Sequence, residues 1–172
     1  ATKRIAYSEP LAGLKAWRGI VRRFSIDSET KADVDRYIAL WAARRHLPEA
    51  QKLLQKLDDA AVNTETGRWL VRSALRARDW RAVNSAIDAL PDAERDKAEW
   101  QYWRAVALQR AGKREQARTL FAELAAGRGY YEFLAADQIG ADYNFAAEKL
   151  VADDRIIAGI VSIPSVIRAL ER

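Results

Sequence analysis

The feature of the sequence that most constrains its fold is an internal repeat. Three segments align without gaps and begin at Arg45, Arg78 and Gly112, so the offsets are 33 and then 34 residues. Apolar residues share columns spaced i, i+3, i+4 and i+7, which form one face of a helix. The matched columns are Ala50/Val83/Ala117, Leu53/Ala86/Leu120, Leu54/Ile87/Phe121 and Leu57/Leu90/Leu124.

A second helical segment precedes each of these segments. Its matched positions are Ile38/Trp41, Val71/Ala74 and Ala105/Leu108. Each unit is therefore predicted to be a helical hairpin, and such hairpins bury their apolar faces only by stacking on one another. The predicted fold is all-α, an α-superhelix of stacked hairpins similar to tetratricopeptide (TPR-like) repeats. With only 8 Gly and 4 Pro to interrupt it, the chain is expected to form about eight to ten helices.

The segments outside the repeat are also predicted to be helical. Residues 9–24 and 130–139 each have the pattern of one helix, residues 145–163 that of one or two, and Pro164 begins a last short helix. The sequence contains no linker rich in Gly or Ser. We therefore expect a single superhelical domain over residues 1–172, with hairpin repeats in 1–140 and linker-type helices in 141–172.

Composition excludes several classes of site. The chain has no Cys, so disulfides, thiolate metal sites and Cys nucleophiles are excluded. His46 is the single His, and a metal needs several ligands. We expect neither a metal nor an organic cofactor. No run of about 20 apolar residues is present, so no membrane span is expected. The net charge of +5 permits an anionic partner but selects none.

Two groups of residues are candidates for substrate binding. Arg68, Arg72 and Arg76 form an i, i+4, i+8 stripe, and Glu65 is the one acid placed to neutralise it on the same helix. The stripe is either an ordinary solvated face or an anion-binding groove on the inner surface of the superhelix. Near a pair of glycines, Arg128, Tyr130 and Tyr131 form either a ligand-facing loop or a helix cap with packing.

Further aromatic and acidic residues have an ordinary structural interpretation beside the functional one. Trp69, Trp80, Trp100, Tyr102 and Trp103 could stack on sugar rings, or they could be large core residues between helices. Acidic pairs such as 58–59 and 153–154 lie at expected helix ends, where acids serve as caps. No catalytic residue is predicted, because no acid has the buried setting that raises the pKa of a general acid.

Two stretches resemble a known family. Residues 99–108 contain Trp100, Tyr102 and Trp103 in a W-x-Y-W-x-A pattern, and residues 129–140 read GYYEFLAADQIG. Both resemble the superhelical part of the soluble lytic murein transglycosylases, with Glu132 where the family usually has Gly. The resemblance covers roughly the last hundred residues, and residues 163–170 resemble the opening of the family's linker region.

The resemblance implies a periplasmic bacterial protein that cleaves the glycan strands of peptidoglycan and forms 1,6-anhydro products. In that family a lysozyme-like domain supplies a catalytic Glu followed by Ser, together with a motif containing Met. This chain has no Glu-Ser pair and no Met. We therefore expect a non-catalytic scaffold fragment that positions the missing domain, binds glycan strands weakly and has no activity alone.

Two other functions remain open at this stage. A free-standing TPR-like adaptor would bind a protein partner through the same stacked hairpins. A helical nucleic-acid binder is suggested by the isoelectric point alone, and we expect no nucleic acid as a partner.

Overall fold

The computed structural model describes residues 1–145 and 153–170. It is 76% helical, and no strand occurs among the described residues. Within these ranges the chain forms twelve α-helices and one 3-10 helix, η1. The elements are α1 (Thr2–Ser8), α2 (Pro10–Arg23), α3 (Ser28–Arg44), α4 (Ala50–Gln55), η1 (Asp59–Ala61), α5 (Thr64–Ala77), α6 (Trp80–Asp88), α7 (Asp92–Arg95), α8 (Ala98–Arg110), α9 (Arg114–Ala125), α10 (Tyr130–Ile139), α11 (Asp154–Val161) and α12 (Pro164–Leu170).

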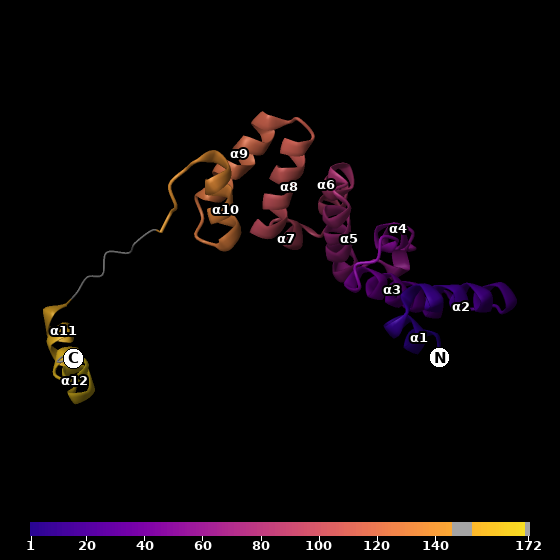
Figure 1. The fold of residues 1–172 in the computed structure, drawn as a ribbon, viewed down its shortest axis with the longest axis horizontal. Helices are drawn as coiled ribbons and strands as arrows, with labels where there is room; N and C mark the ends of the chain where they lie inside the picture. The colour runs from indigo at the N-terminus through magenta and orange to yellow at the C-terminus, as the bar shows by residue number, and fades with distance from the viewer. Residues whose placement is uncertain (146–152, 171–172) are drawn as a thin grey trace.

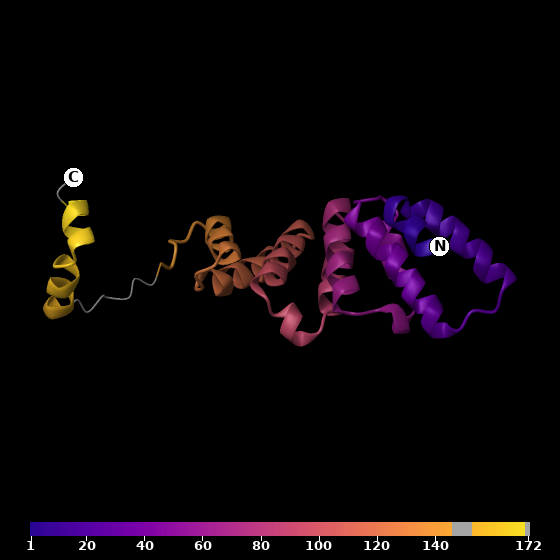
Figure 2. The ribbon, with the colours of Figure 1, turned by 90° about the horizontal axis from the view of Figure 1, so that it is seen from below.

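The helices are stacked in chain order along an arc, as Figures 1 and 2 show from two sides. The three repeat units are the helical hairpins α3/α4, α5/α6 and α8/α9, and the helices of each pair pack on each other. Helices α1 and α2 pack on α3, and α10 packs on α8 and α9. Helices α11 and α12 contact each other and lie apart from the arc (Figure 1). The predicted all-α superhelix is confirmed.

Each hairpin turns at a residue with left-handed backbone geometry. The φ angle is 58° at His46, 55° at Arg78 and 79° at Gly112. Arg78 and Gly112 occupy the same column of the repeat, whereas His46 lies one position later. A positive φ closes the first helix of a pair and lets the chain reverse, so these turns set the boundaries predicted from the repeat.

Two of the four repeat columns are fully buried where the hairpins stack, whereas Leu53 and Leu120 of a third are half-buried. Leu54, Ile87 and Phe121 are at most 4% exposed, and Ala50, Val83 and Ala117 are buried as well. The last column is less uniform. Leu90 is buried, whereas Leu57 and Leu124 are half-buried, and Leu57 lines an open groove beside α2. The expectation of uniform burial in that column is therefore wrong for two of its three members.

The expected number of helices was too low, because short helices and helix breaks were overlooked. Pro10 begins α2 after Glu9, whose φ of −134° is not helical, so α1 and α2 are separate helices. Helix α7 is a single turn after Pro91 that joins the second and third hairpins. The prediction for residues 145–163 is met in part by α11. Residues 146–152 lie outside the described residues, as do 171–172 of the predicted linker-type region.

Helices α1 and α2 approach each other closely at one glycine. A Cβ atom at Gly13 would lie 2.6 Å from the Cβ of Ala6, which is fully buried. Only glycine therefore fits this contact, which holds α1 against the array. Across the described residues, every helix is too short or too polar to cross a membrane.

Candidate functional site

Helix α5 carries the predicted arginine stripe. The helix begins with a capping box, in which the side chain of Asn63 accepts a hydrogen bond from the backbone N–H of Thr66. The Thr66 hydroxyl in turn accepts one from the backbone N–H of Asn63. At the other end, Arg78 closes the helix. These two signals set where α5 begins and ends.

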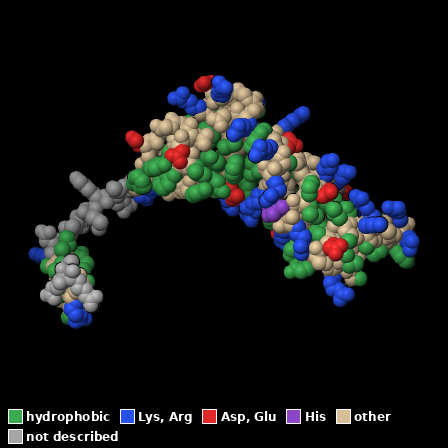
Figure 3. All heavy atoms as spheres, in the orientation of Figure 1, with side chains coloured by type: hydrophobic (Ala, Val, Ile, Leu, Met, Phe, Trp, Pro, Cys, Tyr) green, Lys and Arg blue, Asp and Glu red, His purple; other side chains and the backbone are tan. Residues whose placement is uncertain are grey.

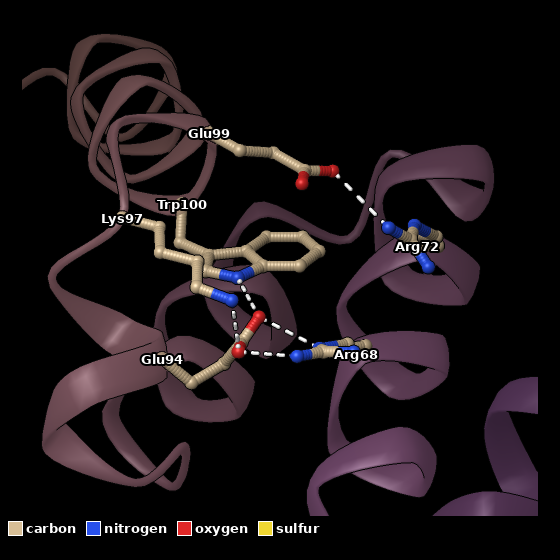
Figure 4. Close-up of polar contacts among 6 residues, drawn as sticks. All are labelled: Arg68, Arg72, Glu94, Lys97, Glu99 and Trp100. Carbon is tan, nitrogen blue, oxygen red and sulfur yellow. Dashed lines mark hydrogen bonds and ion pairs between the residues drawn. The ribbon is translucent and has the colours of Figure 1, made fainter.

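Arg68 is engaged by a buried carboxylate. Its Nε and Nη2 atoms donate to the two carboxylate oxygens of Glu94, at 2.7 and 2.5 Å. Lys97 donates to the same carboxylate at 2.7 Å, and the indole N–H of Trp100 at 2.9 Å (Figure 4). The carboxylate thus joins α5 to α7 and α8 through four donors.

These donors decide the charge of Glu94. The hydrogen bonds from Arg68 lower its pKa far below the ordinary value of 4.5, and those from Lys97 and Trp100 add to this against the opposing effect of burial. Glu94 is therefore ionised at neutral pH. It neutralises Arg68, and an ionised carboxylate cannot donate a proton as a general acid would.

Arg72 lies between two indole rings. Its guanidinium carbon is 5.6 Å from the ring centre of Trp69 and 5.3 Å from that of Trp100. Its Nη2 is 3.3 Å from an oxygen of Glu99, a contact that points across to α8 (Figure 4). Arg72 is therefore held by aromatic faces and one long, partly exposed ion pair.

The third arginine of the stripe opens onto a groove. A cavity of about 820 Å³ lies between the turn joining α3 to α4 and the second half of α5. Its apolar walls include Leu47, Pro48 and Leu75, and the ring of Trp69 lies at its side. Its polar lining comes from His46, Gln51, Arg72, Ser73 and Arg76. None of the residues lining it, all within the described part of the chain, is acidic.

Glu65, the one acid on the same helix that is placed to neutralise the stripe, does not form an ion pair with it. Glu65 forms its ion pair with Arg44, on the preceding hairpin. Arg68 is paired instead with Glu94 of the connecting helix α7, and Arg72 with Glu99 of the following hairpin, at positions that spacing within one helix cannot reveal. Arg76 has no ion pair among the described residues. The structure therefore divides the stripe into a neutralised end and a cationic end.

The second candidate group lies at the turn between α9 and α10. Arg128 donates to the carbonyl of Phe145 at 3.2 Å. Tyr130 is 71% exposed, whereas Tyr131 is half-buried against Tyr102, with ring centres 5.7 Å apart. The side chain of Glu132 covers the backbone of the turn, because a Cβ at Gly127 would lie 2.6 Å from its Cγ.

Tyr131 links this turn to the arginine stripe. Burial raises the pKa of its hydroxyl, and the charge of Glu99 adds to the rise. The nearby indole of Trp103 and the charge of Arg72 both lower the pKa of the hydroxyl and so act in the opposite direction. Tyr131 therefore lies within electrostatic reach of Glu99 and Arg72, while Tyr130 faces solvent.

The clustered aromatic residues divide into a buried group and a half-buried group. Trp100 and Tyr102 are buried, so they are core residues and not open to a sugar ring. Trp69, Trp80 and Trp103 are half-buried at the edges of the core. In Figure 3, hydrophobic side chains gather over α8 to α10, and Lys and Arg are scattered along the arc.

Among the described residues no group of acids and His could hold a metal ion.

Sequence reasoning missed three polar members of the groove, which are His46, Gln51 and Ser73. His46 was considered only as a metal ligand, and Gln51 was not considered. His46 has its ring centre 6.5 Å from that of Trp69. Gln51 donates to the carboxylate of Asp79 at 2.9 Å. The signal that could have found them is their place in the repeat, because a hairpin turn lies beside the first helix of the next hairpin.

The stacked hairpins and the groove between them define an α-superhelical repeat protein. No family model matches the chain. The soluble lytic murein transglycosylase of Escherichia coli is 30% identical over 117 residues, which are 66% of this chain and 18% of that protein. The protein of the same name from Salmonella typhimurium is 31% identical over 99 residues, 56% of this chain and 15% of that protein.

Solved structures agree with the sequence relatives. An inactive variant of lytic transglycosylase Slt from Pseudomonas aeruginosa matches 99% of this chain and 28% of its own, with a TM-score of 0.79 and 27% identity. The 70-kDa soluble lytic transglycosylase of Escherichia coli matches 88% of this chain and 25% of its own, with a TM-score of 0.69. At 22% identity, that likeness shows the fold alone.

Sequence and structure relatives both point to the soluble lytic murein transglycosylase family. The chain spans less than a third of the length of each of these relatives.

Proposed function

We propose that this chain is a helical scaffold segment of a protein that cleaves murein, and that it positions a lysozyme-like catalytic domain and contacts glycan strands. The observation that carries the proposal is the match of 99% of the chain to just over a quarter of a lytic transglycosylase. That match extends through α11 and α12, so it includes the helices that lie apart from the arc.

The acidic residues support a non-catalytic role for the chain by itself. Cleavage of a glycosidic bond needs a carboxyl group that stays protonated near neutral pH, and desolvation without nearby cations provides this. Glu94 is the buried acid of the described residues, and its cationic partners favour the ionised form. The proposed role is therefore to hold and orient, while the chemistry belongs to a catalytic domain.

The proposed partners follow from this role. They are the glycan strands of peptidoglycan and a lysozyme-like domain of the same protein. The family resemblance also supports a site of action in the periplasm, where murein lies. Cell fractionation with an antibody against the chain tests the location.

Incubation of the purified chain with murein sacculi tests the function. We expect the chain to sediment with sacculi and to release no 1,6-anhydromuropeptides above a buffer control, as measured by mass spectrometry. Glu123→Gln and Glu132→Gln are the matched variants. Product that disappears in either variant would show that the chain has its own active site. A chain that stays in the supernatant would refute the glycan-contacting part of the proposal.

A further inference from the structure

The groove between the α3–α4 turn and α5 is lined by basic and uncharged side chains. Its polar side chains can all donate hydrogen bonds, and none of its described lining residues is acidic. The acids near it are already engaged. Glu99 faces Arg72 from α8 at 3.3 Å, and Asp79 accepts both the Gln51 amide and the backbone N–H of Ala82, at 2.9 and 3.1 Å.

Two other basic residues, Arg68 and Lys31, are not in this situation. Arg68 is neutralised by Glu94. In the groove beside α2, Lys31 is bound by Asp35 and Asp58, at 3.0 and 2.7 Å. Arg76 differs from both, because it is exposed, lines a cavity and has no ion pair among the described residues. Its positive charge is therefore available to an incoming anion.

We propose that this groove binds a carboxylate carried on a short apolar arm, which in peptidoglycan is the peptide attached to the sugar. This inference rests on the proposed function, and it names the part of the substrate that the scaffold contacts. Arg76 and the outer edge of Arg72 take the carboxylate, and Leu47, Pro48 and Leu75 contact the apolar arm.

The geometry suits such a ligand in three respects. A guanidinium presents two parallel N–H groups that match the two oxygens of a carboxylate. The indole of Trp69 already holds Arg72 in place, so less side-chain freedom is lost when the ligand binds. The volume of about 820 Å³ lies within the ordinary range of small-molecule sites.

A neutral sugar fits the same groove less well. Sugar hydroxyls need acceptors as well as donors, and sites for them combine acidic or amide side chains with an open aromatic face. Here the described lining of the groove has no acid, its amide Gln51 is already hydrogen-bonded to Asp79, and two of its five polar side chains are arginines. One side of the Trp69 ring is occupied by Arg72. The charge of the ligand should therefore dominate its binding.

Calorimetric titration of the 172-residue chain with three soluble probes tests the proposal. The probes are a murein disaccharide bearing its peptide, the same disaccharide without peptide, and the free peptide. We expect both peptide-containing probes to bind and the bare disaccharide to bind at least about tenfold more weakly, the factor that one charge-assisted hydrogen bond supplies. Binding should weaken as salt is added.

Two variants locate the site. Arg76→Gln should weaken binding of the peptide-bearing disaccharide about tenfold. Arg4→Gln removes the same charge from an exposed position on α1 and should leave binding unchanged. In the unchanged chain, the assigned indole N–H resonance of Trp69 should shift on titration, which reports the groove independently of affinity.

The results separate this inference from the proposed function. Sedimentation with sacculi that is unaffected by Arg76→Gln, or equal binding of the bare disaccharide, would overturn the groove assignment and leave the scaffold role standing. Equal losses in Arg76→Gln and Arg4→Gln would show general charge attraction and would also overturn it. A chain that binds neither sacculi nor any probe would refute the glycan-contacting part of the proposed function, and the groove assignment with it.

Discussion

The carboxylate of Glu94 allows a sharp test of how the second and third hairpins are joined. Glu94→Gln keeps an oxygen for the Trp100 indole but removes the negative charge. The side chains of Arg68 and Lys97, which pair with this charge, are 38% and 52% exposed. Water can therefore replace part of the interaction that they lose. We expect a loss of about 1 kcal/mol in the free energy of unfolding.

Glu94→Ala should cost more, for a different reason. It leaves the fully buried indole N–H of Trp100 without an acceptor. An unsatisfied buried donor costs about 1–3 kcal/mol, so the total loss should be about 2–4 kcal/mol. Asp92→Asn is the matched control, because Asp92 lies on the same short helix with its side chain 85% exposed, and it should change stability by less than about 0.5 kcal/mol.

The same carboxylate predicts a dependence on pH. The pKa of Glu94 is lower in the folded chain than its ordinary 4.5, so its contribution is fully present above pH 4.5 and is lost as the pH falls below that value. Other acids with lowered pKa values, such as Asp33, contribute to acid sensitivity too. The difference between the unchanged chain and Glu94→Gln isolates the effect of Glu94.

Urea unfolding, followed by circular dichroism at several pH values, measures both effects. We expect the stability gap between the unchanged chain and Glu94→Gln to shrink as the pH is lowered from 5 to 3. A gap that stays constant over this range would show that the charge of Glu94 does not hold the hairpins together. Equal stabilities for Glu94→Ala and Asp92→Asn would refute the role assigned to the Trp100 hydrogen bond.

Two further predictions test the packing of the array. Phe121→Ala should lower the free energy of unfolding in urea by about 3–5 kcal/mol, because the Phe121 side chain is 1% exposed. Leu124→Ala should cost clearly less, because Leu124 is half-buried. Equal costs would show that the repeat register is misassigned. Gly13→Ala should destabilise the chain, because the new Cβ would clash with Ala6. Gly19→Ala places its Cβ in open space and should stabilise α2 by up to about 1 kcal/mol. If both variants are stabilised in thermal unfolding, α1 does not pack as described.

Much of the fold follows from short-range patterns in the sequence. The 33- and 34-residue offsets identify the hairpins, and Gly112 marks a turn that needs a residue with a positive φ angle. Helix α10 begins and ends at the residues predicted for it, Tyr130 and Ile139. The one-turn helix α7 was missed because four residues carry no periodicity.

The candidate site was predicted less completely than the fold. The arginine stripe was visible because its members repeat every four residues along one helix. Its neutralisation was not, since Glu94 and Glu99 come from the following elements and meet Arg68 and Arg72 only after the hairpins stack. His46 was passed over for a similar reason, because its position beside Trp69 depends on how α3, α4 and α5 pack.

The stacking of the helices in chain order has a consequence for how the molecule gains and loses its structure. Each helix packs mainly on partners that are close to it in sequence, such as α5 on α6 and α8 on α9. Little chain entropy is then lost before a contact forms, so the array should assemble quickly and from any of its hairpins. A pulling force applied at its ends would unfold the hairpins one after another, and each could refold against the neighbour that stays folded. The array would therefore lengthen under force in steps that can each be recovered.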